Sequence, residues 1–260
     1  MNTPGGAMAT QPWPAGALPV IAAGGAAPPA GAAAYDWAGL ASEIDAHGAA
    51  VVPALLTVPE CAALIDCYDR PEAFRSRVVM QRHGFGRGEY QYFRYPLPPL
   101  VQALRSWLYE PLAQIANRWS SQLQGALRFP ATLAQFSREC HAAGQTRPTP
   151  LLLRYAAGDY NCLHQDLYGE RVFPLQATVL LSAPGEDFDG GEFVLTEQRP
   201  RAQSRAEVVP LRRGDAVIFP VHHRPVQGTR NIHRVNMRHG VSRLRRGMRY
   251  SFGLVFHDAT

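Results

Sequence analysis

Residues 154–170 read RYAAGDYNCLHQDLYGE, and the interpretation of the whole chain starts from this stretch. His164 and Asp166 stand two residues apart in it, after a Gly-Asp turn signal at 158–159. Residues i and i+2 of an extended segment project from the same face, so both side chains can reach one metal ion. A lone His-x-Asp match often arises by chance, so the rest of the sequence has to supply the other parts of a metal site.

The chain from Leu151 onward is rich in short apolar or alternating segments. Turn signals separate seven of them: LLLRY, ATVLLS, GGEFVLTE, AEVVPL, DAVIFPV, HRVNMRHGV and MRYSFGLVF. This density predicts an antiparallel sandwich or jelly roll closed by hairpins.

The preceding part of the chain shows helical spacing instead. Asp36 to His47, Val58 to Tyr68 and Leu100 to Leu123 have apolar residues at helical intervals, and Thr57 with Glu60 has the pattern of a capping box. AAVVPALL at 49–56 predicts a short buried strand. The expected fold class is therefore α+β, with helices packed outside a jelly-roll core.

Composition divides the chain into an arm and a domain. The first 34 residues carry no charged side chain and are dominated by Ala, Gly and Pro, which predicts disorder. We expect a single domain at 35–260, with mainly helical support and a lid over 35–150 and the jelly-roll core over 151–260.

The charge balance and the cysteines suggest partners and compartment. Lys and Arg number 26 against 21 Asp and Glu, an excess that suits a polyanionic partner. The four cysteines show no CxxC spacing, and no window has the apolar length of a membrane span. We therefore expect a cytoplasmic protein that does not enter a membrane.

A facial-triad iron site needs two imidazoles and one carboxylate and leaves three positions open. The second imidazole must come from a distant strand, and the downstream candidates are His222, His223, His233, His239 and His257. A 2-oxoglutarate co-substrate that chelates the iron also needs a cation for its distal carboxylate, and arginine forms such bidentate pairs.

The arginines rank these histidines. Arg249 stands ten residues past His239, with the turn signal RRG at 245–247 between them, so a hairpin is expected to bring the two together. Arg243 stands ten residues past His233, but where the chain heads into the turn. We rank His239 first and His233 second as the third ligand, with Arg249 as the cation.

The order of these motifs resembles the 2-oxoglutarate and Fe(II)-dependent oxygenases. From Leu151 to Ala259 the chain contains HxD, GGEF, GDAVIF, His-Gly-Val and Gly-x-Arg in that order. The resemblance implies a double-stranded β-helix core, Fe(II) held by His164, Asp166 and His239, and 2-oxoglutarate and O2 as co-substrates.

Within that superfamily the chain is closer to the AlkB-like nucleic-acid demethylases, because Leu-His-Gln-Asp follows a Gly-containing turn. This likeness implies that Tyr155 and Ser251 join Arg249 in binding 2-oxoglutarate. Leu153 and Val255 depart from the Asn and Arg that this group has at the matching positions.

The chain also resembles a bacterial group usually described as oxygenases acting on damaged DNA, in QSR at 203–205 and in VNMRHGVS. The implied partner is alkylated DNA or RNA. Hydroxylation of an N-methyl group on a base gives an unstable hemiaminal that releases formaldehyde.

The segment QRHGFGRGEYQYF at 81–93 predicts a mobile loop or hairpin that is a candidate substrate lid. Sites for single-stranded nucleic acid combine positive charge with aromatic faces. The expected substrate contacts are Arg82, Arg87, Tyr90, Tyr92 and Phe93. An ordinary glycine-rich connection whose aromatics cover the sheet explains the segment equally well.

Two other functions remain open. A prolyl-hydroxylase-like oxygenase that hydroxylates a protein side chain or a small metabolite shares HxD, GGEF and the distal cation. A non-catalytic β-sandwich or cupin-like binding module would keep the fold without turnover, and the intact triad argues against it.

Overall fold

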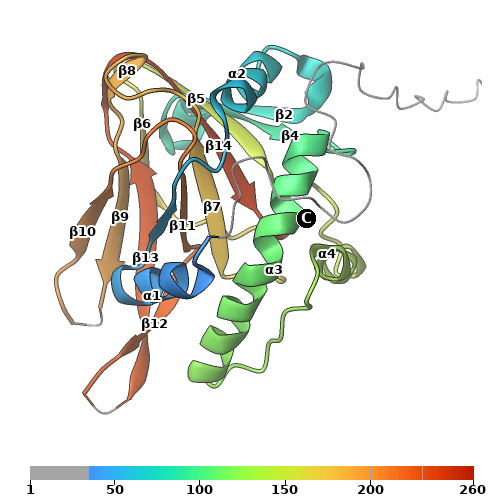
Figure 1. The fold of residues 1–260 in the computed structure, drawn as a ribbon, viewed down its shortest axis with the longest axis vertical. Helices are drawn as coiled ribbons and strands as arrows, with labels where there is room; N and C mark the ends of the chain where they lie inside the picture. The colour runs from blue at the N-terminus through green and yellow to red at the C-terminus, as the bar shows by residue number, and fades with distance from the viewer. Residues whose placement is uncertain (1–34, 200, 230) are drawn as a thin grey trace, which may run out of the picture.

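The computed structural model describes residues 35–199, 201–229 and 231–260 (Figure 1). The arm predicted at 1–34 lies outside the described residues. The helices of the described part are α1 Trp37–His47, α2 Val58–Cys67, α3 Pro99–Gln122 and α4 Leu133–Ala142, with 3-10 turns η1 Pro71–Ala73 and η2 Met80–His83. The strands are β1 Ala50–Val52, β2 Phe74–Val79, β3 Gly86–Arg87, β4 Glu89–Phe93, β5 Leu151–Ala156, β6 Tyr160–His164, β7 Leu175–Leu180, β8 Phe188–Gly190, β9 Phe193–Gln198, β10 Arg205–Val209, β11 Ala216–Pro220, β12 His223–Gln227, β13 Ile232–Val241 and β14 Leu244–Val255.

These strands form two antiparallel sheets. The eight-stranded sheet has the order β1-β11-β7-β14-β5-β4-β2, and β8 pairs with β14. The six-stranded sheet has the order β10-β9-β13-β6-β3, and β12 pairs with β13. Each of the seven segments predicted as strands contributes one, and the predicted α+β jelly roll is confirmed.

The helices cover the eight-stranded sheet, and α3 runs alongside it with α4 beside it (Figure 1). The largest hydrophobic core joins helix residues such as Leu64, Leu104 and Phe136 to the strand residues Val179 and Leu254. A second apolar cluster, which contains Phe193, Leu195, Phe219, Val235 and Met237, fills the interior on the side of the six-stranded sheet. Although α3 has 24 residues, no helix of the described part combines the length and the apolarity needed to cross a bilayer.

The ends of the first two helices follow the signals in the sequence. The Asp36 carboxylate accepts hydrogen bonds from the backbone N–H groups of Ala38 and Gly39, at 3.1 and 3.0 Å. Gly48 ends α1 in the left-handed conformation with φ 83°. Thr57 and Glu60 form the predicted capping box at the start of α2.

The segment at 81–93 contributes to both sheets, because β3 pairs with β6 of the six-stranded sheet and β4 belongs to the eight-stranded sheet. Strand β4 pairs with β2 on one side and with β5 on the other, so it lies inside the eight-stranded sheet. The predicted hairpin is therefore present in part: β4 is its second strand, and its first strand, β2, lies before residue 81.

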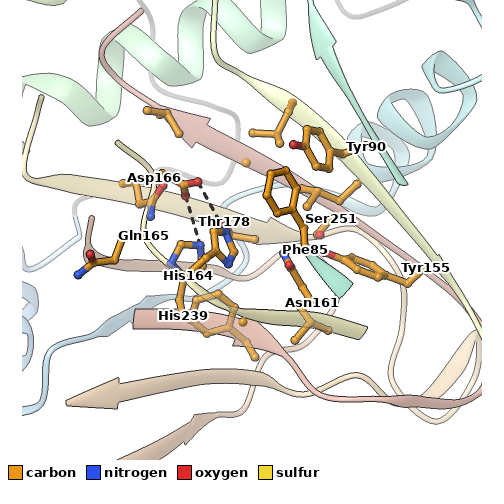
Figure 2. Close-up of a pocket in the computed structure, with 18 of the residues that line it drawn as sticks. Phe85, Tyr90, Tyr155, Asn161, His164, Gln165, Asp166, Thr178, His239 and Ser251 are labelled. Carbon is orange, nitrogen blue, oxygen red and sulfur yellow. Dashed lines mark hydrogen bonds and ion pairs between the residues drawn. The ribbon is translucent and has the colours of Figure 1, made fainter. Parts of the chain in front are cut away.

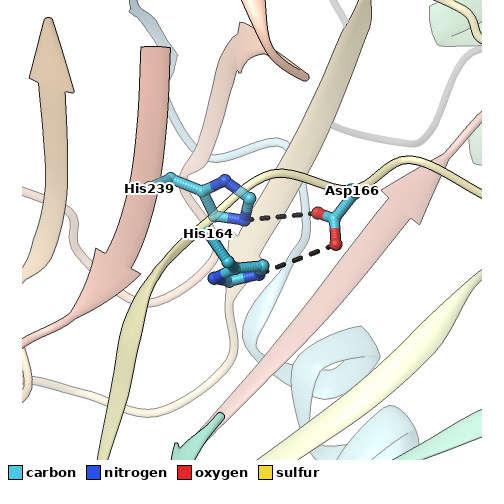
Figure 3. A group of neighbouring side chains, drawn as sticks. All are labelled: His164, Asp166 and His239. Carbon is cyan, nitrogen blue, oxygen red and sulfur yellow. Dashed lines mark ion pairs between the residues drawn. The ribbon is translucent and has the colours of Figure 1, made fainter. Parts of the chain in front are cut away.

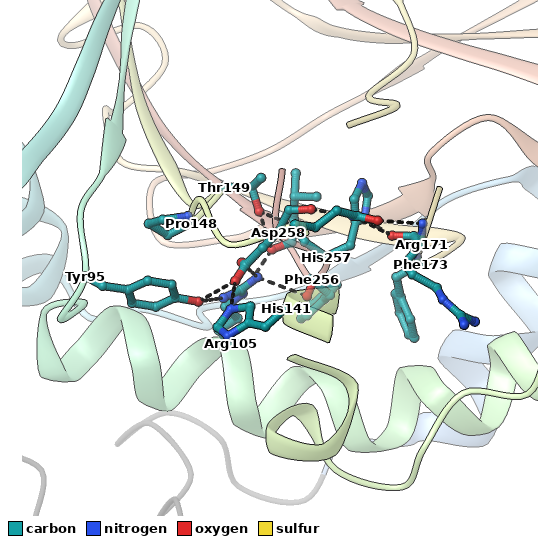
Figure 4. Close-up of polar contacts among 12 residues, drawn as sticks. Tyr95, Arg105, His141, Pro148, Thr149, Arg171, Phe173, Phe256, His257 and Asp258 are labelled. Atoms are coloured by element: carbon teal, nitrogen blue, oxygen red, sulfur yellow. Dashed lines mark hydrogen bonds and ion pairs between the residues drawn. The ribbon is translucent and has the colours of Figure 1, made fainter. Parts of the chain in front are cut away.

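A buried polar network ties the C-terminal residues to the helices (Figure 4). The Arg105 guanidinium, on α3, donates to Asp258 Oδ1 at 2.7 Å and to the carbonyl oxygens of Val255 and Phe256 at 3.1 and 3.0 Å. Tyr95 OH donates to Asp258 Oδ2 at 2.8 Å, and His141 Nε2, on α4, lies 2.8 Å from the same oxygen. The network therefore fixes the end of β14 against α3 and α4.

Candidate active site

Two strands and one connecting segment bring a carboxylate and two imidazoles together (Figure 3). His164 is the last residue of β6, Asp166 follows that strand, and His239 lies on β13 directly opposite His164. His239 Nε2 is 3.3 Å from Asp166 Oδ2, and His164 Nε2 is 3.6 Å from Asp166 Oδ1. One ligand atom from each residue falls within a group spanning no more than 4.8 Å. This donor set suits a divalent iron with open positions.

A β-bulge in β6 directs the side chains of this strand. His239 pairs with His164, and Val241 pairs with Asn161. Between these two pairs the chain advances three residues along β6 but only two along β13, so β6 has one extra residue. Asn161 and His164 therefore both line the cavity, whereas Leu163 is 42% exposed. Asp166 lies beyond the strand, so the expected alternation along one extended segment does not by itself explain its position.

Charge and protonation in the group suit metal binding. His164 Nδ1 lies 2.8 Å from the carbonyl oxygen of Cys162, so Nδ1 carries the proton and Nε2 is free to bind a metal. Burial, with the neighbouring His239, lowers the pKa of His164. Burial acts to raise the pKa of Asp166, but its hydrogen bond and charge interaction with His239, supported by His164 and Tyr168, hold that pKa below the usual range.

The second-ranked histidine is not part of this group. His233 lies near the start of β13 and pairs with Val226 of β12. The group that the structure brings together among the described residues contains His239 instead.

A cavity of about 190 Å³ opens beside the group. Figure 2 shows Tyr155, Asn161 and Ser251 on one side of it and the triad, with Thr178 next to it, on the other. Its further lining is largely apolar and includes Leu151, Leu153, Val241 and Val255.

Arg249 is a buried cation that lines this cavity. Its side chain is 1% exposed, Nη1 donates to Ser251 Oγ at 3.1 Å, and Nε has no hydrogen-bond partner in the structure. Among the described residues no carboxylate forms an ion pair with it, and burial lowers its pKa. A buried charge without a counter-ion is costly, so the site fits an anionic ligand such as the distal carboxylate of 2-oxoglutarate.

Tyr155 stands beside this cation. The Arg249 guanidinium carbon lies 5.6 Å from the centroid of the Tyr155 ring, and Asn161 Nδ2 donates to Tyr155 OH at 3.4 Å. Burial raises the pKa of Tyr155 to about 12, against a lowering effect of Arg249, so the phenol keeps its proton and can donate it to an anion.

The connection between His239 and Arg249 differs from the prediction. Strand β13 ends at Val241 and β14 begins at Leu244, so the turn precedes the RRG stretch at 245–247. The two strands belong to different sheets, so the predicted hairpin is wrong. His239 and Arg249 line the same cavity because the chain crosses from one sheet to the other.

The five residues predicted to contact substrate separate into groups. Tyr90 lines the cavity, and Arg82 and Arg87 are exposed. Tyr92 is 8% exposed and Phe93 is 0% exposed. Tyr92 is buried against Tyr168 and Arg75, and Phe93 is buried against Phe74 and Phe252, so the predicted stacking of these two on a base is wrong.

Sequence reasoning missed Phe85, which is 47% exposed and lines the cavity next to Tyr90 (Figure 2). Its position between Gly84 and Gly86 could have indicated that Phe85 projects from the sheet, because both glycines have positive φ, which lets the chain turn there. It also missed Asn161, which faces the cavity only because of the bulge.

Comparison with known proteins identifies the family. A sequence model for Oxygenase-NA, described as "Oxygenase, catalysing oxidative methylation of damaged DNA", matches residues 88–259. The chain belongs to this family. The matched part of the chain includes the triad, Arg249 and all the strands from β5 to β14.

Two curated relatives and one solved structure are also similar to this chain. Uncharacterized proteins of Mycobacterium tuberculosis, from strains CDC 1551 / Oshkosh and H37Rv, are each 47% identical over 167 residues, which is 64% of this chain and 72% of theirs. A prolyl hydroxylase from Trichoplax adhaerens, solved with a hypoxia inducible factor oxygen degradation domain peptide fragment, has a TM-score of 0.52 at 13% identity. That likeness covers 85% of this chain and 89% of the other, and it is a likeness of fold.

The chain is therefore an oxygenase with a jelly-roll fold. As an oxygenase it uses O2, and among the described residues His164, Asp166 and His239 form a group that could hold a metal ion.

Proposed function

We propose that this protein removes an N-alkyl group from a damaged nucleic-acid base by oxidation, with His164, Asp166 and His239 as the iron ligands. The observation that supports these ligands most directly is the convergence of their ligand atoms beside a cavity that also contains a buried cation. A structural histidine pair would need neither that cavity nor that cation.

2-Oxoglutarate, as the co-substrate, would lie between the triad and Arg249. Its distal carboxylate would accept hydrogen bonds from the Arg249 guanidinium, with Tyr155 and Ser251 as further partners. Two features support this placement: the free Nε of Arg249, and the protonated phenol of Tyr155.

With Fe(II) and O2, 2-oxoglutarate supplies an oxidant that hydroxylates a C–H bond and leaves succinate and CO2. The protein's own part is to orient the substrate and to exclude water. The apolar walls formed by Leu151, Leu153 and Val255 serve that exclusion. A hydroxylated N-methyl group would then break down to formaldehyde and the repaired base.

The mouth of the cavity supports a nucleic-acid substrate. Phe85 is exposed there and stacks on His83, with ring centroids 5.3 Å apart and planes at 22°. Arg82 and Arg87 are exposed in the same short segment, so cations flank an aromatic face. This combination binds phosphates and unstacked bases, and the description of the family names damaged DNA.

Turnover with defined substrates tests the proposal. Purified protein with Fe(II), 2-oxoglutarate and O2 is given N-methylated single-stranded oligonucleotides, the unmethylated oligonucleotides, or proline-containing peptides, and succinate and formaldehyde are measured. We expect formaldehyde from methylated oligonucleotides alone, and none with His164→Ala. Stimulation by the peptides, with no response to oligonucleotides, would favour the prolyl-hydroxylase-like alternative.

We further propose that residues 35–260 form one oxygenase domain that works in the cytoplasm. The hydrophobic core shared by the helices and the eight-stranded sheet supports a single domain. The four free cysteines support the cytoplasm, where thiols stay reduced.

A further inference from the structure

The carboxylate of the triad lies outside the strands that hold the two imidazoles. Strand β6 ends at His164, and residues 165–174, which lead to β7, form no helix or strand. The hydrogen bonds between β6 and β13 fix His164 and His239, but they do not extend to Asp166. Other contacts must therefore set its orientation.

Two side chains on either side of Asp166 provide those contacts. Gln165 Nε2 donates to the carbonyl oxygens of Met237 and His222, at 2.8 and 3.2 Å, and so fixes the chain just before Asp166. Tyr168 OH donates to Asp166 Oδ1 at 2.6 Å and so holds the carboxylate group itself.

Tyr168 is in turn held from the eight-stranded sheet. Tyr92 OH, on β4, donates to Tyr168 OH at 3.2 Å, and the two rings meet edge to face with centroids 6.3 Å apart. The Arg75 guanidinium carbon, from β2, lies 4.5 Å from the centroid of the Tyr92 ring. The Tyr168 hydroxyl thus accepts one hydrogen bond and has its proton left for Asp166.

We propose that Tyr168 is a positioning residue that decides which oxygen of Asp166 binds iron. Oδ1 is held by the phenol, whereas Oδ2, 3.3 Å from His239 Nε2, is left for the metal. Binding through one oxygen keeps three positions of the metal open, and chelation through both oxygens would occupy one of them. The inference rests on the metal ligands proposed above.

Anaerobic metal titration tests this role without relying on turnover. In Tyr168→Phe we expect the Kd for Fe(II) to rise about 10- to 100-fold, the usual effect of removing a partner that orients a metal ligand. The visible spectrum of the Co(II)-substituted variant should also change, because it reports coordination number. Tyr109→Phe is the matched control, since its hydroxyl donates to the carbonyl oxygen of Pro130 at 3.0 Å, outside the site, and it should leave both readouts unchanged.

Each outcome decides between defined alternatives. Unchanged Fe(II) affinity and an unchanged Co(II) spectrum in Tyr168→Phe overturn the inference, provided that His164→Ala loses the metal. If His164→Ala binds Fe(II) as the wild type does, the proposed ligand set itself is wrong. If Tyr168→Phe does not fold, Tyr92→Phe is tested instead, because this change removes the hydroxyl that donates to Tyr168 OH and leaves Tyr168 in place. A weaker Fe(II) affinity in that variant supports the role, and an unchanged one overturns it.

Discussion

At the scale of single residues, Arg249 is fully buried, and among the described residues no carboxylate lies within ion-pair distance of it; Glu192 acts on it only from farther away. Such a charge destabilises the empty protein, and a bound anion offsets that cost. The chain therefore keeps at this position a side chain that serves binding more than folding.

Replacing Arg249 with Met should separate these two effects. We expect the cofactor-free variant to keep or raise its free energy of unfolding in urea. Binding of 2-oxoglutarate to the Fe(II) protein should weaken by about 2–5 kcal/mol, which is roughly 30-fold or more. Arg243→Met, at an exposed position, should change neither quantity. A destabilised Arg249→Met variant with normal 2-oxoglutarate affinity would contradict the proposed anchor.

Phe85 allows a test of base stacking at the same scale. Stacking on an aromatic ring contributes about 1–3 kcal/mol per base, so Phe85→Leu should weaken binding of a methylated single strand by roughly fivefold or more. Phe85→Trp should retain the affinity. Leu167→Ala, at another exposed apolar position, is the control in the same fluorescence anisotropy assay. Equal affinity of the Leu and Trp variants would argue against stacking.

At the scale of elements, β6 and β13 approach very closely at the bulge. A Cβ added to Gly240 would lie 2.7 Å from the carbonyl oxygen of Asn161, which is backbone and cannot move alone. The register of the two strands therefore depends on a glycine at this position.

Gly240→Ala should push β6 away from β13 and disturb the triad. We expect a loss of about 1–3 kcal/mol in stability together with weaker Fe(II) binding, measured by urea unfolding and anaerobic titration. Gly144→Ala should cost about 1–2 kcal/mol through its left-handed backbone alone, because open space surrounds it. Normal Fe(II) affinity in Gly240→Ala would show that the site tolerates a wider spacing.

The elements also show how far the sequence can be interpreted. Helices with local caps, such as the one at Thr57, and strands with clear alternation are predictable because their signals lie within a few residues. The bulge in β6 and the partners of β4 are set by strands distant in the sequence. For this reason His164 and His239 could be predicted, whereas Asn161 and the burial of Phe93 could not.

At the scale of the whole molecule, the network around Asp258 connects the helical layer to the end of the jelly roll. Arg105→Met should lower the free energy of unfolding by about 3–5 kcal/mol, because it leaves a buried carboxylate without its cation. Arg118 lies on α3, as Arg105 does, and forms a partly exposed ion pair with Asp45 of α1. Arg118→Met should therefore cost less than about 1 kcal/mol. If both variants lost a similar free energy of unfolding in urea, the network around Asp258 would not provide this extra stability.

The two sheets divide the work of the site between them. The imidazoles belong to β6 and β13 of the six-stranded sheet, and Tyr155, Arg249 and Ser251 belong to β5 and β14 of the eight-stranded sheet. 2-Oxoglutarate bound to the metal of the triad and to Arg249 would connect the two sheets of the sandwich. Amide hydrogen exchange should then slow on β13 and β14 together when the metal and 2-oxoglutarate are bound, although neither strand pairs with the other.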